Sequence, residues 1–443
     1  SNILDIKTFQ QVPNKPLHLK VSLLTGSYGL VSPQIFAENL IRSKKRTDRY
    51  FLWNISANYL LSKGDYPYIL HYGGQNDSIS HEKRQNSDIS AFNAELNARI
   101  QFNSLQRLTF KWYYYDSERG LPSATIFYNL ESAQRLWNRN TFAQLQYQYG
   151  GTPEKKNCYK LSAKFNYDFT HYLDPEYLNA QGKIDNTYRQ FEGYLSNAYL
   201  FKPVLLTHKK KTEHKDKFLF SVANDLIYNQ LESNATDFLH PSRLTTLTSF
   251  SGKYEHNILT VNANLLLTTV NNFSQTANST LKDAYVRVSP MCGISINATS
   301  KIKIRAFYKN IFRMPTFNDL YYREVGNLNL KPEKTHQTDV GIVFDQLNLT
   351  LSRNVWLSAA LDGYFNIVKD KIVAFPSRNL FSWTMLNYGI VYIGGAELNA
   401  QLSYQFVKKH SLNLTANCTY QKAVDRTDPQ NKTYNHQIRN DNL

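Results

Sequence analysis

The feature of this sequence that most constrains its fold is an alternation of apolar and polar residues with a period of two. Between Ser90 and Tyr115, apolar side chains occupy every second position on both sides of a tight connection at 104–107. Successive side chains of a strand point to opposite faces, so each strand has one apolar and one polar face. About ten such residues, tilted, cross a bilayer. One hairpin of this kind fits either a soluble sandwich or a transmembrane barrel, whose apolar face meets lipid.

Repetition of the pattern favours the barrel. Apolar and polar residues also alternate at 51–61, 159–170, 259–268, 302–309 and 412–418. The 443 residues include 31 Tyr, 25 Phe and 5 Trp, and such aromatic density is typical of the interfacial girdles of outer-membrane barrels. The sequence contains no run of about 18 consecutive apolar residues, so it predicts no transmembrane helix. No Pro/Gly/Ser-rich linker is present, which favours one domain over the two or three of a soluble chain this long.

Connections of two lengths alternate along the chain and predict a barrel with two different ends. Short periplasmic turns and long extracellular loops are typical of bacterial outer-membrane barrels. Short turns are predicted near 104–107, 255–257, 297–301, 349–353 and 406–410. Long polar connections are predicted near 64–90, 116–138, 172–187, 230–242, 271–283, 313–334 and 370–383. The segment 203–217 falls on the short side and is interpreted as an enlarged turn, with a solvated lysine run at 209–211.

The segments between these connections predict about 17 or 18 strands. An open sheet edge in lipid leaves backbone hydrogen-bonding groups unpaired, which costs several kcal/mol for each group. The sequence also shows no signal peptide. We therefore expect an all-β fold, a transmembrane antiparallel β-barrel that is incomplete. Within it, Phe165 and Tyr167 are expected to face outward, and Lys164 and Asn166 to face the lumen.

Enzyme signatures and metal-ligand motifs are absent from the sequence. It has no glycine-rich phosphate loop, nucleophile elbow or His-Glu-x-x-His motif, so we do not expect an enzyme. Its three cysteines and 11 histidines show neither metal-ligand nor redox spacing. The formal charge of +16 comes from basic residues on alternating strand positions and in loops. A wet lumen and contact with anionic lipopolysaccharide explain this charge better than nucleic acid does.

Two adjacent motifs carry a resemblance to a known family. Residues 312–322 read Phe-Arg-Met-Pro-Thr-Phe-Asn-Asp-Leu-Tyr-Tyr, and residues 326–333 read Gly-Asn-Leu-Asn-Leu-Lys-Pro-Glu. This pair resembles the extracellular loop signature of TonB-dependent outer-membrane receptors, usually Arg-x-Pro-Thr-Phe-x-Glu-Leu-Tyr and Asn-x-Asn-Leu-Lys-Pro-Glu. Asp319 stands where Glu is common, and Leu328 where Pro is common. The residues that match the signature are Arg313, Pro315, Thr316, Phe317, Asn318, Leu320, Asn327, Leu330, Pro332 and Glu333.

Within this family, the chain is most similar to cobalamin-receptor-like members from Bacteroidetes. The supporting segments are 116–122, 134–137, 172–177, 370–374 and 379–383. The resemblance implies a multi-pass protein of the bacterial outer membrane that takes up a scarce large nutrient, preferentially cobalamin (vitamin B12). A haem or ferric-siderophore receptor, and a passive channel or adhesin-like barrel, remain alternatives. Haem uptake often uses axial His ligands, and only His336 lies near the signature.

The resemblance also implies how the chain is organised. Complete members have an N-terminal plug within a barrel of about 22 strands. Residues 1–16 would be the end of the plug and a linker, with the last plug strand at Ile3–Thr8, and residues 17–443 a partial barrel. The implied partners are the TonB complex, through the plug region, lipopolysaccharide and the membrane, and a surface lipoprotein. No cofactor is required.

Ligand-binding candidates come from the long-loop side. Aromatic faces suit a flat corrin or porphyrin, and Arg and Asn suit its amide or carboxylate periphery. The candidates are Arg119, Trp137, Tyr321, Tyr322, Arg323, Trp383, Asn387 and Tyr388. The alternative is that the Tyr and Trp belong to the interfacial girdle and that Arg313 only holds its own loop. Asp116, Asp174 and Glu176 carry oxygen atoms of the kind that calcium prefers, although loop capping is the favoured interpretation of these acids.

Overall fold

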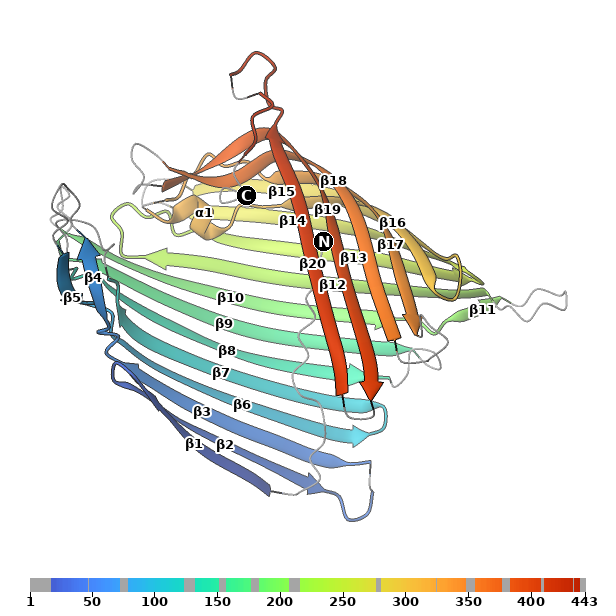
Figure 1. The fold of residues 1–443 in the computed structure, drawn as a ribbon, viewed down its shortest axis with the longest axis horizontal. Coiled ribbons are helices and arrows are strands. Elements are labelled where there is room, and N and C mark those ends of the chain that lie inside the picture. The colour runs from blue at the N-terminus through green and yellow to red at the C-terminus, as the bar shows by residue number, and fades with distance from the viewer. Residues whose placement is uncertain are drawn as a thin grey trace.

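The computed structural model describes residues 17–46, 48–71, 79–122, 132–150, 157–176, 183–206, 216–275, 280–323, 325–347, 355–376, 383–407, 410–432 and 434–438. These residues form one antiparallel sheet of 18 strands, curved into an incomplete cylinder (Figure 1). The strand count and the all-β class agree with the prediction. The postulated plug strand at 3–8 and the lysine run at 209–211 lie outside the described residues.

The strands follow one another around the wall in chain order. In the first half they are β1 (Leu17–Gly26), β2 (Leu30–Arg42), β3 (Tyr50–Ser62), β6 (Ile89–Asn103), β7 (Gln106–Gly120), β8 (Arg135–Tyr149), β9 (Cys158–Asp174) and β10 (Ile184–Leu200). In the second half they are β11 (Val204–Leu206), β12 (Asp216–Ser233), β13 (Ser242–His256), β14 (Leu259–Gln275), β15 (Thr280–Asn297), β16 (Ile302–Arg313), β17 (Glu333–Leu347), β18 (Val355–Pro376), β19 (Trp383–Val407) and β20 (His410–Asp425). The short β11 does not separate β10 from β12, because both β10 and β11 pair with β12, one beyond the end of the other.

Two small elements stand apart from this wall. β4 (Pro67–His71) pairs with β5 (Ile79–Lys83) in a separate hairpin between β3 and β6. A five-residue helix, α1 (Phe317–Tyr321), lies between β16 and β17. Both elements lie at the end of the cylinder that we call the loop end (Figure 1). The opposite end, the turn end, holds the tight connections at 104–105 and 257–258.

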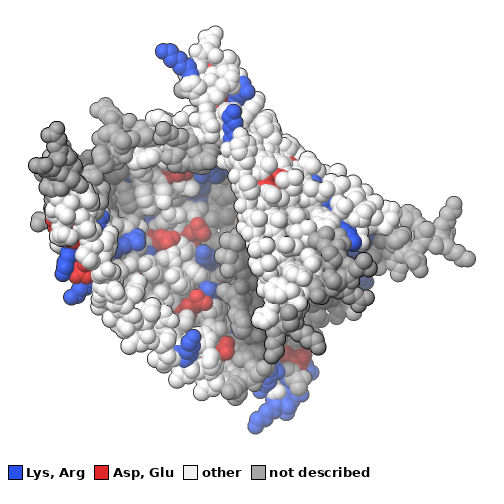
Figure 2. All heavy atoms as spheres, in the orientation of Figure 1, with Lys and Arg blue, Asp and Glu red and all other residues white. Residues whose placement is uncertain are grey.

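The two faces of the sheet differ in polarity as the period-two pattern predicts. Phe165 is 54% exposed, whereas the Lys164 ammonium lies 4.8 Å from the centre of the Phe142 ring on the inner face. Asn166 donates a hydrogen bond to Asp168, two residues further along that face. Acidic and basic side chains gather inside the hollow of the sheet, while the outer wall in view is mostly uncharged (Figure 2). The predicted orientation of this strand is therefore confirmed.

Several strands are longer than the sequence predicted, because their polar ends remain paired beyond the apolar alternation. β7 extends to Gly120 and pairs with β8 from Arg135, where the sequence predicts a loop. Ion pairs cross this hairpin from Arg139 to Asp116 at 2.9 Å and from Arg135 to Glu118 at 2.6 Å. Opposite charges on neighbouring strands stabilise pairing that hydrophobic alternation does not reveal.

In the part of the chain that the structure describes, the sheet ends in two edge strands. Among the described residues, β1 pairs only with β2, and β20 pairs with β19 apart from one isolated bridge between Val424 and Gln437. Nearly every residue of β1 is exposed, and β20 is exposed from His410 to Tyr420 but partly buried towards Asp425. In addition, none of the helices in the described ranges is long and apolar enough to cross a membrane.

Candidate functional site

The family-like signature forms a folded loop that begins with α1. Thr316 precedes the helix and its hydroxyl accepts a hydrogen bond from the Asp319 backbone N–H at 3.1 Å. The Asp319 carboxylate accepts in return from the Thr316 N–H at 2.9 Å. This reciprocal capping box satisfies donors that a helix start otherwise leaves unpaired. An aspartate at 319 therefore performs the capping role for which glutamate is the more common residue.

The first half of the loop packs against β10, β12 and β13. Phe317 is buried together with Tyr188 and Leu231. The Arg243 guanidinium, 8% exposed, donates to the Pro315 carbonyl at 2.8 Å and lies 5.0 Å from the centre of the Phe317 ring. A buried guanidinium needs such partners, because an unpaired buried charge is costly. Arg243 thus anchors the signature loop from a strand 72 residues away in sequence.

Two tyrosines predicted to contact ligand are engaged in this packing. The Tyr322 ring stacks on Tyr188 with centroids 4.1 Å apart, and the Tyr188 hydroxyl accepts from the Arg323 N–H at 3.0 Å. Tyr321 packs edge-on against Phe317 at 5.6 Å. Burial raises the pKa of both Tyr321 and Tyr322 above their ordinary value. The Arg323 side chain is exposed, so it is the member of this group that remains accessible.

The second half of the loop is held by amide side chains. Asn387, in β19, accepts from the Lys331 N–H at 2.8 Å and donates to the carbonyls of Lys331 and Asp370 at 3.1 and 2.7 Å. Asn327 donates to the Met385 carbonyl at 2.9 Å. These bonds occupy both polar atoms of the Asn387 amide. Its role in this structure is therefore to connect the loop to β18 and β19.

Glu333 lies at the centre of the remaining loop contacts. It is 9% exposed, and its carboxylate accepts from the Ile372 N–H at 3.2 Å. The Arg313 guanidinium lies 3.5 Å from Glu333 and 3.7 Å from Asp319, so it spans the two ends of the loop. This geometry fits the interpretation that Arg313 holds its own loop.

The other signature residues support this conformation or lie at its surface. Pro315 is fully buried, Leu330 is 8% exposed, and Leu320 and Pro332 are half-buried. The Asn318 side chain is exposed. Most of the signature residues therefore stabilise the loop.

Arg119 and Trp137 are on strands, which corrects the prediction of a loop at 116–138, and Trp383 and Tyr388 are on the strand that returns from the 370–383 connection. Arg119 is in β7 and Trp137 in β8, whereas Trp383 is the first residue of β19 and Tyr388 follows it. Their polar neighbours hid the continuation of the strands. Tyr388 packs against a buried cluster that contains Val368, Val391, Ala423 and Ile438.

Trp137 and Arg119 lie on opposite faces of the wall. Trp137 stacks on His171 at 4.6 Å on the outer face, a placement that fits the girdle interpretation. Arg119 shares its face with Lys111, which lines the lumen, since residues an even number apart on a strand share a face. Of these two candidates, only Arg119 can meet a ligand inside the barrel.

The three acids considered for calcium are used in other contacts or lie apart. Asp116 pairs with Arg139 on β8. Asp174, at the end of β9, accepts from the Gln134 amide at 2.8 Å and from the Glu176 N–H at 3.2 Å, which is a loop-capping arrangement. Throughout the described segments, no group of three or more His, Cys, Asp or Glu is placed to hold a metal ion.

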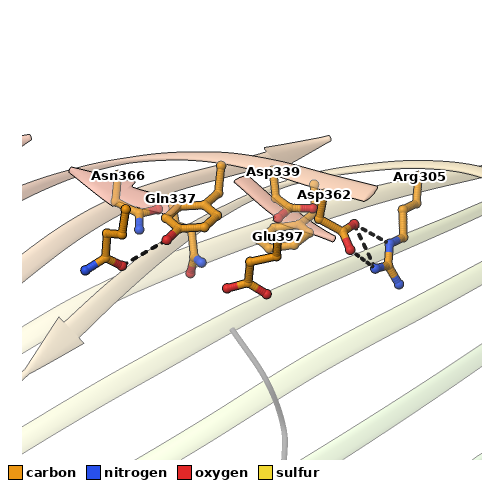
Figure 3. A pocket seen from close by; sticks show the side chains of 9 residues that line it. Arg305, Gln337, Asp339, Asp362, Asn366 and Glu397 are labelled. Atoms are coloured by element: carbon orange, nitrogen blue, oxygen red, sulfur yellow. Dashed lines mark hydrogen bonds and ion pairs between the residues drawn. The ribbon is translucent and has the colours of Figure 1, made fainter. Parts of the chain in front are cut away.

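A polar pocket that the sequence did not indicate lies on the lumen wall between β16 and β20 (Figure 3). Its volume is about 390 Å³. Asp362 forms a bidentate pair with Arg305 at 2.7 Å, and the Asp339 and Glu397 carboxylates lie beside it. A Cβ at Gly341 would collide with the Asp362 carboxylate. Because these residues come from four strands, only the register brings them together.

Comparison with known proteins decides the family. The model of the family described as TonB dependent receptor-like, beta-barrel, matches residues 86–440. The chain belongs to this family. Its members are outer-membrane transporters and not enzymes, in agreement with the sequence analysis.

Sequence relatives match only part of the chain. Over 108 residues, it is 32% identical to the vitamin B12 transporter BtuB of Vibrio vulnificus and 30% identical to that of Photobacterium profundum. Each match covers 24% of this chain and 16% of the relative.

Solved structures of low sequence identity share the fold. The copper transporter OprC matches with a TM-score of 0.65 and 13% identity over 95% of this chain and 65% of its own. The FrpB iron transporter from Neisseria meningitidis matches with a TM-score of 0.66 and 13% identity, over 93% and 62%. The Serratia marcescens hemophore receptor HasR matches with a TM-score of 0.63 and 12% identity, over 92% and 64%. The chain thus spans less than two thirds of the length of these proteins.

Proposed function

We propose that this chain is the barrel of an outer-membrane receptor for active uptake of a large nutrient, and that the nutrient is cobalamin. The observation that carries the proposal is the 32% identity over 108 residues to a vitamin B12 transporter. A corrin ring is flat and apolar, with amide groups on its rim. Such a ligand needs both aromatic surfaces and hydrogen-bonding side chains.

Three ligand candidates keep free surface for this role. Arg323 and Trp383 are exposed at the loop end, where the two halves of the signature loop meet β19. Arg119 faces the lumen from the opposite part of the wall. Uptake against a gradient requires energy, which TonB supplies in this family. We therefore include TonB as a partner of the complete gene product.

Equilibrium binding to the complete gene product tests the proposal. Calorimetry in detergent should give a dissociation constant for cyanocobalamin in the nanomolar to micromolar range, about −12 to −8 kcal/mol. Haemin and a ferric siderophore should bind more weakly. If haemin or an iron chelate binds tightly and cyanocobalamin gives no heat of binding, the protein is a receptor for an iron source. Absence of binding by all three ligands would favour a passive channel.

A further inference from the structure

Three polar side chains on the lumen wall each have one buried atom that lacks a hydrogen-bond partner. They are Ser117 and Arg119 on β7 and Asn138 on β8. The atoms concerned are Ser117 Oγ, Arg119 Nε and Asn138 Oδ1. Ser117 is only 4% exposed. Buried polar groups in proteins are nearly always hydrogen-bonded, and an unpaired one costs about 1–3 kcal/mol.

Strand register places the three side chains next to one another. Ser117 lies directly opposite Asn138, and cross-strand neighbours have Cβ atoms about 5 Å apart. Arg119 follows Ser117 by two residues and therefore shares its face. On the other side of β7, Ala91 lies opposite Ser117 and Ile89 opposite Arg119. These apolar neighbours offer no side-chain hydrogen bond to the three groups.

The acids near this cluster are engaged elsewhere. Asp116 and Glu118 alternate with Ser117 and Arg119 along β7, so they point to the outer face, where they pair with arginines of β8. On the lumen face, Asp168 of β9 accepts hydrogen bonds from the amides of Asn140 and Asn166. No described residue forms an ion pair with Arg119. The Arg119 side chain lies on the lumen face, and its Nε–H has no acceptor among the described residues.

We propose that Ser117, Arg119 and Asn138 form a subsite for a primary carboxamide on the rim of the transported ligand. The Ser117 hydroxyl and Arg119 Nε–H are donors for the carbonyl oxygen of such an amide, and Asn138 Oδ1 is an acceptor for its NH₂ group. A carboxylate would fit only if the Asn138 amide turned so that its NH₂ group faced the ligand, and Asn138→Asp distinguishes these two cases. This subsite rests on the proposed function, since cobalamin carries primary carboxamides around its corrin ring.

Substitutions in the complete gene product test the subsite with cyanocobalamin as the probe. Ser117→Ala, Arg119→Lys and Asn138→Leu should each raise the dissociation constant by roughly 5- to 50-fold, because each removes one hydrogen bond to the ligand. Asn138→Asp should stay within about threefold of wild type, since a carboxylate still accepts from an amide NH₂. The matched control is Arg107→Lys on the same face of β7, where Arg107 already bonds Gln148 at 2.6 Å. The control should bind like wild type.

The outcomes separate this inference from the proposed function. If wild type binds cyanocobalamin and Ser117→Ala, Arg119→Lys and Asn138→Leu bind equally well, the subsite is overturned and the receptor function stands. If wild type does not bind cyanocobalamin, both are overturned. If the affinity of a ligand falls more with Asn138→Asp than with Asn138→Leu, the ligand places an anionic group beside residue 138. That result would also overturn the inference that the subsite binds a carboxamide. Heat-modifiable migration on gels verifies that each variant is folded before binding is measured.

Discussion

At the scale of single residues, the signature of the family is explained by hydrogen bonding within one loop. Asn387 and Arg243 each hold a part of this loop that lies far away in sequence, and Glu333 of the loop accepts a hydrogen bond from Ile372 of β18. Each is a polar group with at least one backbone partner. Losing one such side chain leaves backbone donors or acceptors unpaired, which costs more than the mean value of a hydrogen bond.

Asn387→Ala is expected to destabilise the signature loop. The substitution removes three hydrogen bonds to Lys331 and Asp370, which corresponds to a loss of about 1–3 kcal/mol in the free energy of unfolding. A lower urea midpoint in detergent would be the measured result. The matched control is Asn318→Ala, because Asn318 lies exposed on α1 in the same loop. Equal midpoints for the two variants would contradict the role given to Asn387.

Gly326→Ala is expected to displace the same loop for a steric reason. A Cβ at Gly326 would lie 2.5 Å from the Tyr322 carbonyl oxygen and 2.8 Å from that of Leu320. Both are backbone atoms and cannot rotate away, so overpacking should cost about 1–3 kcal/mol. Gly193→Ala is the control, since nothing lies within 4 Å of its added Cβ. Proteolysis of the loop in intact cells should increase only for Gly326→Ala.

At the scale of elements, α1 is too short to be stable by itself. Isolated helices shorter than about 12 residues are marginal in water, and α1 has five. Its conformation depends on the capping box and on the tyrosine packing against β10. Five residues are too few to show the hydrophobic periodicity from which longer helices are predicted. For this reason the sequence did not predict α1, although Thr316 and Asp319 carry its capping signal.

The packing of α1 should weaken at high pH. Burial raises the pKa of Tyr321 and Tyr322 above the ordinary value of 10.0, so the folded loop holds these protons more tightly than the unfolded loop does. The stability that the neutral tyrosines give is complete below pH 10 and is lost as pH rises through their folded pKa values. Thermal midpoints between pH 8 and 11 should fall less for the double variant Tyr321→Phe/Tyr322→Phe than for wild type. Parallel curves would disprove the coupling.

At the scale of the whole molecule, the period-two pattern predicted the barrel class and the inward face of β9, and the positions of the connections predicted the strand count. These features depend on local alternation, which the sequence displays directly. The pocket beside Asp362 and the contact of Arg243 with Pro315 depend on register and on residues 57 and 72 positions apart. Candidate residues such as Trp137 were assigned to loops because charged residues at the strand ends interrupt the apolar pattern. Those charges form ion pairs between strands, which only the pairing reveals.

The two free edges of the sheet lead to a prediction for residues 1–443 produced alone. Within the described ranges, β1 and β20 each have one edge without a partner strand. In lipid, every unpaired backbone group costs several kcal/mol, and exposed edges pair readily with other chains. Expressed with an added signal peptide, residues 1–443 should aggregate or be degraded in the periplasm, whereas the complete gene product should give a heat-modifiable outer-membrane band. A stable detergent-extracted monomer of residues 1–443 with protease-protected strands would mean that β1 and β20 can close the cylinder themselves.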